Sequence, residues 1–416
     1  MRHGLNFLML IFLAATIAFA GCRGPADPWA NVVHSDVLDK AGVQYYWQKL
    51  IDLSKGERIA RLLRLDENLY CLTDRNRIIA IDAQKGVFKW SQTIGTPAQM
   101  VFRFVHVDRM SLGENVATIE EIVDPAKLKR QPSFGALIVN TENRVTVINR
   151  DSGQVVRDIP FNFVANTGGG SDGKSFFVAS TGGVVYMVQL EEAAEFPVFS
   201  PEAMISSPIA CYGGNFYVGT VNSRFQARLI RPQGSAAAWT KTLGGAVMAA
   251  SPERTLFYVG DNGCFVPCSD GRLYAFHPLH GGDLWNQPFV CQGPLISPVQ
   301  VGKQTIFQYA DRDKLYAIDL ATGRKRWDNP AGRLALSVMD NEVFMLDGAR
   351  NLLIVDEMLG TVKQSFAMTG YELFAANTLA PAVWAASVDG KVVCIRKLSA
   401  GHLKPDMLGP TTRPMQ

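Results

Sequence analysis

The chain has 416 residues, in which 41 Lys and Arg nearly balance 38 Asp and Glu, so its formal net charge is +3. This balance excludes the strongly basic composition typical of nucleic-acid-binding proteins, and we expect no nucleic acid partner. Hydrophobic residues make up 47% of the chain and charged residues 19%, which excludes an intrinsically disordered protein. The 37 Gly and 21 Pro residues, together with few long helical patterns, favour a turn-rich all-β protein.

Residues 1–21 have the pattern of a secretory signal peptide. A short basic start precedes an apolar run over residues 5–19, which is too short to span a membrane comfortably as a mature helix. The run ends in Phe19-Ala20-Gly21-Cys22, which resembles a bacterial lipobox with Phe in place of the usual Leu at its first position. We therefore expect cleavage before Cys22 and lipidation of its thiol. The alternative is an ordinary signal peptide that is cut near Ala20.

Lipidation of Cys22 predicts a protein tethered to a membrane by acyl chains and located outside the cytoplasm. Arg23 stands where Asp would favour retention in the inner membrane, so we expect an outer-membrane anchor with the protein facing the periplasm. Residues 22–40 are then expected to form the lipid-anchored linker.

Six cysteines remain after Cys22, and the expected compartment permits disulfides. Cys264 and Cys268 lie close together between two strand patterns, and we expect that they could form a disulfide across a hairpin loop. The other four fit small apolar positions in strands, where buried cysteines are common.

Three segments of the chain are copies of one unit. In each, an apolar strand ends at a polar anchor, Gly follows four residues later and Trp eight residues later. These positions are Asp82, Gly86 and Trp90 in the first copy, His277, Gly281 and Trp285 in the second, and Asp319, Gly323 and Trp327 in the third. The anchor can accept hydrogen bonds from the turn, the Gly tolerates the positive φ that closes a hairpin, and the Trp can fill the space between neighbouring units.

Weaker copies extend the pattern to eight anchors with a spacing of about 40 residues, which is typical of a four-stranded propeller blade. We predict an eight-bladed β-propeller over residues 41–398, with seven blades as the alternative if the degenerate unit around Gln189 merges with its neighbour. The last unit lacks an outer strand, whereas residues 45–50 have the pattern of one. Pairing of this N-terminal strand with the last blade would close the ring. Residues 399–416 are expected to form a flexible tail.

One step between anchors is about 25 residues longer than the others, which predicts an insertion over residues 109–133. Long insertions in compact repeats are often functional, so this segment is a candidate surface for binding a partner protein. Its charged residues that could make such contacts are Glu120, Glu121, Lys127, Lys129 and Arg130.

The sequence offers no catalytic constellation. His277 and His280 form the closest histidine pair, but no acidic or Cys ligand lies near them in sequence, so we expect no metal site. The segment 168–175 matches a phosphate-binding loop in letters, yet a strand follows it where a helix is needed.

The units ending in Tyr274-Ala275-Phe276, in Tyr316-Ala317-Ile318-Asp319 and in Gly323 to Trp327 resemble the PQQ repeats of the quinoprotein-like propeller superfamily. The resemblance extends from about residue 45 to residue 398. One branch contains quinone-cofactor dehydrogenases, which are longer and usually carry adjacent cysteines and a carboxylate-rich calcium site. The other branch contains non-enzymatic scaffolds, the BamB-like lipoproteins of outer-membrane β-barrel assembly.

This chain has no Cys-Cys pair, so the resemblance favours the BamB-like branch. It implies a periplasmic scaffold without a cofactor, whose partner is an envelope protein such as a subunit of the outer-membrane assembly complex. Two alternatives stay open. One is a quinone-cofactor or small-ligand enzyme that uses the central channel, and the other is an envelope sensor or sugar-binding module with exposed Trp residues.

Overall fold

A computed structural model describes residues 27–110, 133–251 and 256–408. The chain divides into two compact units, residues 1–32 and residues 33–416. In the first unit, the described residues 27–32 form a turn in which Asp27 Oδ1 accepts a hydrogen bond from the Trp29 N–H at 2.9 Å. Among the described residues, no helix combines the length and apolar character needed to cross a membrane.

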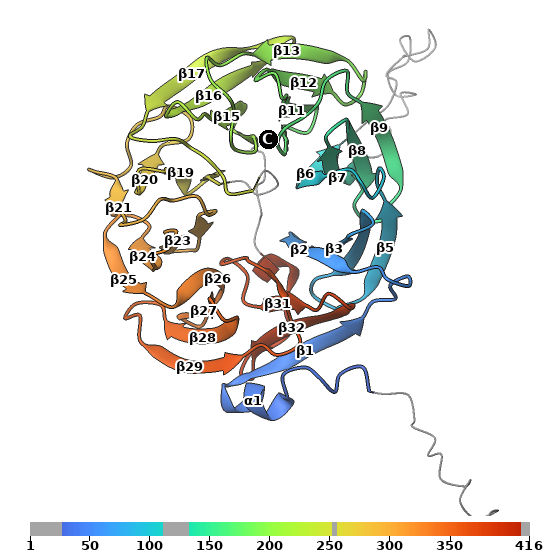
Figure 1. Cartoon of the computed structure of the whole chain (residues 1–416), viewed down its shortest axis with the longest axis vertical. Coiled ribbons are helices and arrows are strands. Elements are labelled where there is room, and N and C mark those ends of the chain that lie inside the picture. The colour runs from blue at the N-terminus through green and yellow to red at the C-terminus, as the bar shows by residue number, and fades with distance from the viewer. Residues whose placement is uncertain (1–26, 111–132, 252–255, 409–416) are drawn as a thin grey trace, which may run out of the picture. The chain divides into compact units, whose positions relative to one another are not determined.

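The second unit is a ring of eight four-stranded antiparallel sheets in the part of the chain that the structure describes (Figure 1). Each sheet is one blade, with its strands named a to d from the central axis outwards. Blade 1 comprises β2 (Ile59–Leu65), β3 (Asn68–Thr73), β4 (Arg77–Asp82) and β5 (Phe88–Thr93), and blade 2 comprises β6 (Val101–Met110), β7 (Phe134–Thr141), β8 (Arg144–Asn149) and β9 (Val155–Pro160). Blade 3 comprises β10 (Gly170–Ser171), β11 (Ser175–Ala179), β12 (Val185–Gln189) and β13 (Glu195–Phe199), and blade 4 comprises β14 (Ala210–Tyr212), β15 (Asn215–Gly219), β16 (Arg224–Arg231) and β17 (Gly234–Thr242).

The remaining blades repeat this plan. Blade 5 comprises β18 (Tyr258–Gly260), β19 (Gly263–Pro267), β20 (Arg272–Phe276) and β21 (Phe289–Val290). Blade 6 comprises β22 (Gln300–Val301), β23 (Thr305–Tyr309), β24 (Leu315–Asp319) and β25 (Lys325–Asn329). Blade 7 comprises β26 (Gly332–Met339), β27 (Glu342–Asp347), β28 (Asn351–Asp356) and β29 (Val362–Ala367). The predicted eight blades are therefore confirmed, and the unit around Gln189 is an independent blade.

Blade 8 closes the ring as the sequence predicts. It takes three strands from the end of the chain, β30 (Leu373–Ala375), β31 (Val383–Ala386) and β32 (Lys391–Lys397), and its outer strand β1 (Val43–Leu50) from the beginning. The antiparallel register runs from Val43 opposite Lys397 to Leu50 opposite Lys391. This pairing covers the edge of β32 that would otherwise be exposed.

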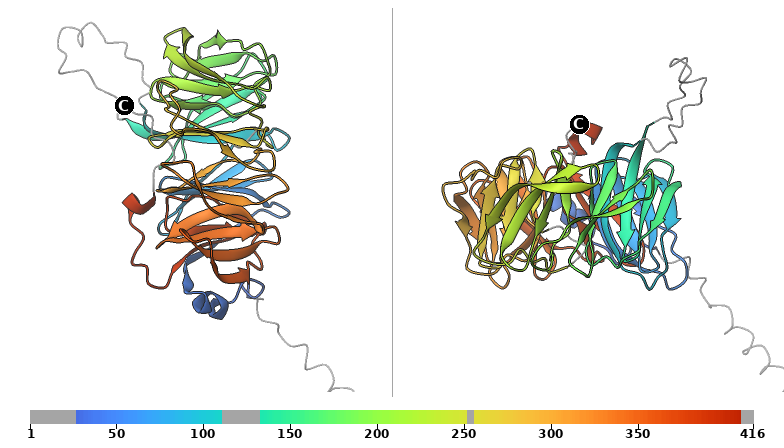
Figure 2. Two further views of the ribbon diagram at one scale, coloured as in Figure 1. Left: turned by 90° about the vertical axis from the view of Figure 1, so that its left-hand side faces the viewer. Right: turned by 90° about the horizontal axis from the view of Figure 1, so that it is seen from above.

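The strand directions give the ring two distinct faces, which Figure 2 shows edge-on. Because the strands in a blade alternate in direction, the a–b and c–d turns lie on one face, which we call the turn face. The b–c turns and the connections between blades lie on the opposite face, the connection face. The expected insertion therefore follows β6 on the turn face.

The blades are held together by the repeat residues. Trp90 of blade 1 is 5% exposed and donates a hydrogen bond from Nε1 to the Arg150 carbonyl of blade 2 at 2.8 Å. Its ring lies against Gly153, where a Cβ atom would come within 2.6 Å of Trp90 Cγ. The same pairing of Trp with the turn Gly of the next blade recurs as Trp47–Gly86, Trp239–Gly281, Trp285–Gly323 and Trp327–Gly360.

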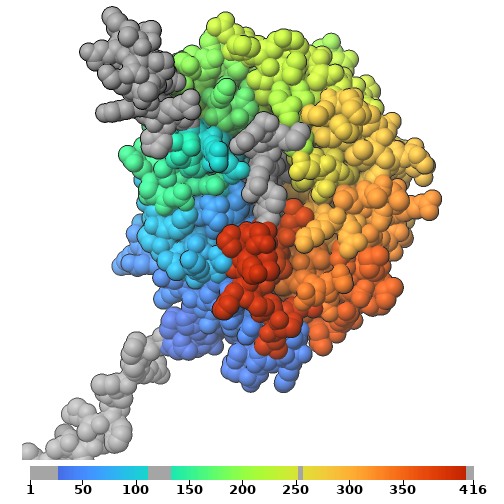
Figure 3. Space-filling model, turned by 180° about the vertical axis from the view of Figure 1, so that it is seen from behind, coloured from blue at the N-terminus to red at the C-terminus, as the bar shows by residue number. Residues whose placement is uncertain are grey.

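Two terminal segments differ from the expectation. Helix α1 (Ser35–Lys40) occupies part of the expected linker, and its Leu38 is 1% exposed. The expected flexible tail packs against the ring over residues 399–408, which include the 3-10 helix η2 (Pro405–Leu408). Leu403 and Leu408 are buried in an apolar cluster with strands of blades 1 and 8, and that burial fixes the segment. Figure 3 shows it in red on one face of the ring.

Candidate functional site: the central channel

The inner strands of several blades enclose a cavity of about 600 Å³ in the central channel. Its walls come mainly from β2, β6, β26 and β30, with contributions from the segment around Gln300 in blade 6. The floor between the charged groups is apolar, supplied by side chains such as Leu63, Phe104 and Leu334. A cavity of this size is in the range that holds small molecules.

The charged residues that line this cavity are mostly arginines. They are Arg61 and Arg64 from β2, Arg103 from β6, Arg333 from β26, and Arg350 from the b–c turn of blade 7. Glu372 supplies a carboxylate among the lining residues, and its Oε2 accepts a hydrogen bond from the Val388 N–H at 3.1 Å. The channel wall is therefore strongly positive in a chain whose net charge is only +3.

Arg64 is the most deeply placed of these side chains, with 4% of its surface exposed. Its guanidinium lies 5.4 Å from the ring centre of Trp384, and Nη2 donates a hydrogen bond to the Leu408 carbonyl. Nε and Nη1 are buried, and no described residue accepts a hydrogen bond from either. Burial lowers the pKa of Arg64 to about 10, so the side chain keeps its charge at neutral pH.

Arg103 and Arg333 hold their side chains in place with backbone oxygens. Arg103 Nη1 donates to the Ile209 carbonyl at 2.6 Å, which links blade 2 to blade 4 across the channel wall. Burial lowers the pKa of Arg103 to about 10. Arg333 Nη1 donates to the Pro330 and Gly332 carbonyls at 2.8 Å, and its guanidinium lies 5.1 Å from the ring centre of Tyr309. These contacts fix the guanidinium groups without neutralising them.

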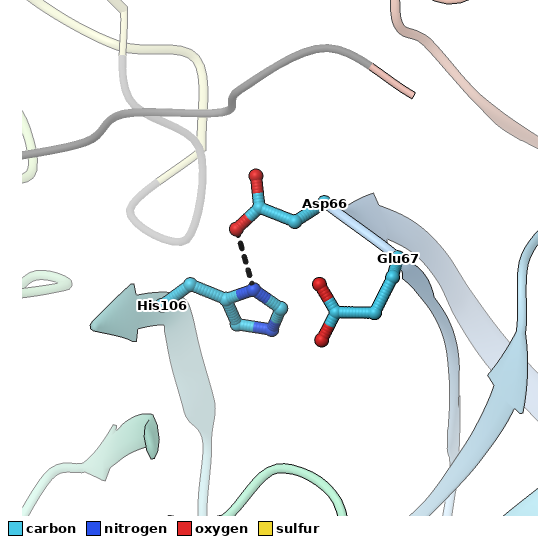
Figure 4. A group of neighbouring side chains, drawn as sticks. All are labelled: Asp66, Glu67 and His106. Atoms are coloured by element: carbon cyan, nitrogen blue, oxygen red, sulfur yellow. Dashed lines mark hydrogen bonds and ion pairs between the residues drawn. The ribbon is translucent and has the colours of Figure 1, made fainter. Parts of the chain in front are cut away.

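His106 also lines the cavity and lies beside Asp66 and Glu67, as Figure 4 shows. The ligand atoms of these three side chains lie within 4.8 Å of one another, which is close enough for a shared metal ion. Asp66 and Glu67 form the turn between β2 and β3, whereas His106 belongs to β6. The group therefore joins blade 1 to blade 2.

The hydrogen bonds of His106 do not fit a metal ligand. Asn68 Nδ2 donates to the Tyr70 hydroxyl at 2.7 Å, and that hydroxyl is hydrogen-bonded to His106 Nε2 at 2.8 Å. Nδ1 then carries the ring proton and donates to Asp66 Oδ2 at 2.8 Å. Both ring nitrogens therefore already have hydrogen-bond partners in this arrangement.

The carboxylates of the same group are engaged by Arg150. Its Nε lies 3.1 Å from Glu67 Oε1, and its Nη1 lies 3.2 Å from Asp108 Oδ1 and 3.8 Å from Asp66 Oδ2. Burial alone would lower the pKa of Arg150, but these carboxylates outweigh burial and raise it. The group is therefore an ion-pair and hydrogen-bond network between two blades.

The disulfide expected between Cys264 and Cys268 does not form. Both are free, buried thiols, and the three residues between their positions belong to strand β19. An extended strand separates such positions by about 13 Å, well beyond the reach of a disulfide. Burial raises the pKa of Cys268 and of Cys291 to about 12, so neither thiol is activated as a nucleophile.

The repeat anchors lie on the outer part of the turn face, away from the channel wall. Asp82 Oδ1 accepts hydrogen bonds from the Gln84 and Lys85 N–H groups at 2.9 and 2.8 Å. His277 takes the same role through Nδ1, which accepts from the Leu279 N–H at 3.2 Å, while its ring stacks on His280. Asp319 Oδ1 accepts from the Thr322 N–H at 2.8 Å. These residues are structural elements of the turns.

Two groups of expected site residues lie outside the described residues. They are the lipidation site Cys22 and the insertion residues Glu120, Glu121, Lys127, Lys129 and Arg130. The structure describes the flanks of the insertion, where β6 continues to Met110 and β7 begins at Phe134.

A row of exposed apolar side chains lies on the connection face. Each of the first four connections between blades carries one, and we call this set the apolar arc. Its members are Met100 (46% exposed), Val164 (53%), Met204 (55%) and Met248 (44%). Methionine adapts its shape readily, and exposed apolar rows on a rigid ring are suited to contact another protein.

Comparisons with known proteins agree with this architecture. No curated protein matches the chain. A family model described as "Outer membrane protein assembly factor BamB" matches residues 269–403, which run from blade 5 to the buried C-terminal segment. The crystal structure of BamB from Moraxella catarrhalis superposes with a TM-score of 0.60 at 12% sequence identity, and the match covers 86% of this chain and 99% of that chain.

The chain is a β-propeller that carries BamB-like PQQ repeats over residues 269–403. A computationally designed protein, Ika8, superposes nearly as well, with a TM-score of 0.58 at 12% identity over 84% of this chain and 99% of that chain. In all, 1548 solved chains match, so the structural likeness identifies the fold of this BamB-like propeller and not its function.

Sequence reasoning missed the channel arginines and the His106 network. The signal was present, because Arg61, Arg64 and Arg103 interrupt apolar runs of inner strands. Without the ring, however, a strand arginine that faces solvent cannot be distinguished from one that faces the central axis.

Proposed function

We propose that this BamB-like propeller is a lipid-anchored, non-enzymatic scaffold in the periplasm, which binds a subunit of the outer-membrane β-barrel assembly machinery. The observation that carries the proposal is the match of residues 269–403 to a family of assembly factors, in blades that form one continuous ring. The thiols with raised pKa values and the fully engaged His106 network also support a binding role over a catalytic one.

The Trp residues argue against the sugar-binding alternative. A sugar platform needs exposed indole rings on one face, whereas Trp90, Trp285, Trp327 and Trp384 are between 0% and 6% exposed. They pack between blades and donate their Nε1–H groups to backbone oxygens. The ring thus uses these side chains for cohesion.

Two surfaces on opposite faces are available for docking. The insertion follows β6 on the turn face, and the apolar arc lies on the connection face. We propose that the insertion is the docking segment, since it is the largest departure from the regular repeat. Removal of residues 111–132 leaves β6 and β7 intact and allows them to be joined by a short turn.

The test is affinity purification of the tagged protein from detergent-solubilised membranes, with identification of the captured proteins by mass spectrometry. We expect the intact protein to recover barrel-assembly subunits and the variant lacking residues 111–132 to lose them. A variant carrying Met204→Asp and Met248→Asp tests the connection face. The control is Leu359→Asp on the turn face of blade 7, where the side chain is already 72% exposed.

The outcomes separate the alternatives. Loss of capture with the aspartate pair, and not with the deletion, would move the docking surface to the connection face. An intact protein that recovers no barrel-assembly subunit would overturn the proposed function.

Lipidation is tested separately with Cys22→Ala. We expect this variant to leave the membrane fraction, because a single acylated residue supplies the proposed anchor. Signal-peptide cleavage and the thermal unfolding temperature of the folded ring serve as controls. Unchanged membrane association after the substitution would contradict the proposed anchor.

A further inference from the structure

Burial of the Arg64 side chain costs free energy. Three N–H groups of its guanidinium, on Nε and Nη1, are buried without a described acceptor. Buried charged donors without partners are strongly unfavourable, and proteins retain few of them. Arg64 contacts Trp384 and the Leu408 carbonyl, and the carboxylates of Asp66 and Glu67 offset part of its charge.

The surroundings of Arg64 share this excess of positive charge. Arg103 and Arg333 line the same cavity. Arg103 contacts a backbone carbonyl, and Arg333 contacts backbone carbonyls, an aromatic ring and, electrostatically, the Asp347 carboxylate. Arg350 adds a further charge on the lining, against the single lining carboxylate of Glu372. In a site with limited access to water, such a set attracts anions more strongly than it would on an open surface.

We propose that the central channel binds a small anion carrying carboxylate or phosphate groups, with Arg64 and Arg103 as its principal ligands. This site is distinct from the docking surfaces of the scaffold, and it requires no chemical reaction. Guanidinium groups suit both carboxylate and phosphate oxygens, because their N–H donors lie in one plane at fixed angles.

The cavity limits the size and character of the ligand. A volume of about 600 Å³ accommodates a small molecule and excludes a folded domain or a nucleic acid duplex. The apolar side chains between the arginines, among them Phe104 and Leu334, favour an anion with some carbon skeleton. A bound anion would offset the positive charge of the arginines that line the cavity, Arg64 among them.

The test is isothermal titration calorimetry of the full-length mature protein with two probes, pyrophosphate and citrate. We expect at least one of them to bind and to raise the thermal unfolding temperature. Binding of pyrophosphate alone would identify a phosphate site, and binding of citrate alone a carboxylate site. Absence of binding by both probes at low ionic strength would overturn the proposal.

Substitutions then assign the site. Arg64→Met and Arg103→Met should each weaken binding about tenfold or more, because each removes charged hydrogen bonds to the anion. The matched control is Arg224→Met, whose side chain is 42% exposed and pairs with Glu202 on the surface. Equal weakening by the control, or unchanged affinity in both channel variants, would contradict the assignment.

Stability in the absence of anion separates a binding role of Arg64 from a structural one. If Arg64 is retained for a ligand, Arg64→Met removes an unsatisfied buried charge, and the unfolding temperature without anion should stay the same or rise. The increase in unfolding temperature caused by the anion should disappear in the same variant. A lower unfolding temperature, with the response to anion retained, would assign Arg64 a purely structural role. If Arg64→Met fails to fold, Arg103→Met and Arg333→Met carry the same comparison.

Discussion

Among single residues, Glu57 makes a pH-dependent contribution to stability. Its side chain is 2% exposed, and its carboxylate accepts hydrogen bonds from Arg77 Nε and Nη2 at 2.9 and 2.8 Å. Burial raises the pKa of Glu57, but Arg77 and the Ser54 N–H outweigh burial and lower it to about 2. The folded-state pKa is thus below the unfolded value, so the stabilisation is complete above about pH 4.5 and is lost as the pH falls toward 2.

We predict that Glu57→Gln lowers the free energy of unfolding at pH 7 by about 2–3 kcal/mol, since it leaves Arg77 without its anion. The variant should also lose part of the decline in stability between pH 4.5 and 2. Urea unfolding at pH 7, 4 and 3 measures both effects. Asp158→Asn is the control, because Asp158 pairs with Arg144 at an exposed site where an ion pair contributes little. Parallel pH profiles for wild type and Glu57→Gln would contradict the prediction.

Residues of the turns were predictable from sequence, whereas residues of the channel were not. Asp82, Gly86 and Trp90 act within one hairpin and its neighbour, so their roles follow from local spacing. Arg64 and His106 derive their environment from blades that are far apart in sequence. Their burial depends on closure of the whole ring, which no local pattern encodes.

At the scale of single turns, His277 is a natural substitution within the repeat. Its Nδ1 accepts one backbone hydrogen bond, whereas Asp82 at the equivalent position accepts two. We predict that His277→Asp keeps the stability or raises it by up to about 1 kcal/mol, and that His277→Ala lowers it by about 1 kcal/mol. Thermal and urea unfolding measure both variants. Equal destabilisation by the two substitutions would show that the imidazole ring of His277, and not the hydrogen bond that its Nδ1 accepts, supports the turn.

Contact between neighbouring blades depends on the turn glycines. Gly360 has a φ of +73°, and a Cβ atom there would lie 2.6 Å from Trp327 Cγ. Gly183 has a φ of +79° with no atom within 4 Å of its Cβ position, so it shares the backbone strain without the contact. We predict that Gly360→Ala lowers the free energy of unfolding by at least about 2 kcal/mol more than Gly183→Ala. Urea unfolding of the two variants gives the difference, and equal losses would contradict an essential role of the Trp contact.

For the whole molecule, the architecture was predictable where it repeats, and the terminal segments were not. The spacing of the anchors gave eight blades and the closing strand, both of which the structure confirms. Helix α1 and residues 399–408 were expected to be linker and tail. Leu38, Leu403 and Leu408 lie in short segments without a strand or helix repeat, and nothing in their spacing indicates that each is buried against the ring.

Closure by β1 should determine whether the ring is stable as a monomer. In addition to its register with β32, β1 places Trp47 against Gly86 of blade 1, and Trp47 Nε1 donates to the Ala83 carbonyl at 3.2 Å. Without β1, the apolar strand β32 would become an exposed edge, and the contact between blades 8 and 1 would be weakened.

We predict that a soluble form lacking residues 23–50 self-associates and unfolds at a lower temperature, whereas a form lacking residues 23–31 stays monomeric and stable. Size-exclusion chromatography with light scattering and thermal unfolding measure these properties. A synthetic peptide of residues 41–52 should restore the monomer, because it supplies the missing strand to β32 and the Trp47 side chain to blade 1. A monomeric deletion variant with unchanged stability would mean that the other blades hold the ring closed without β1.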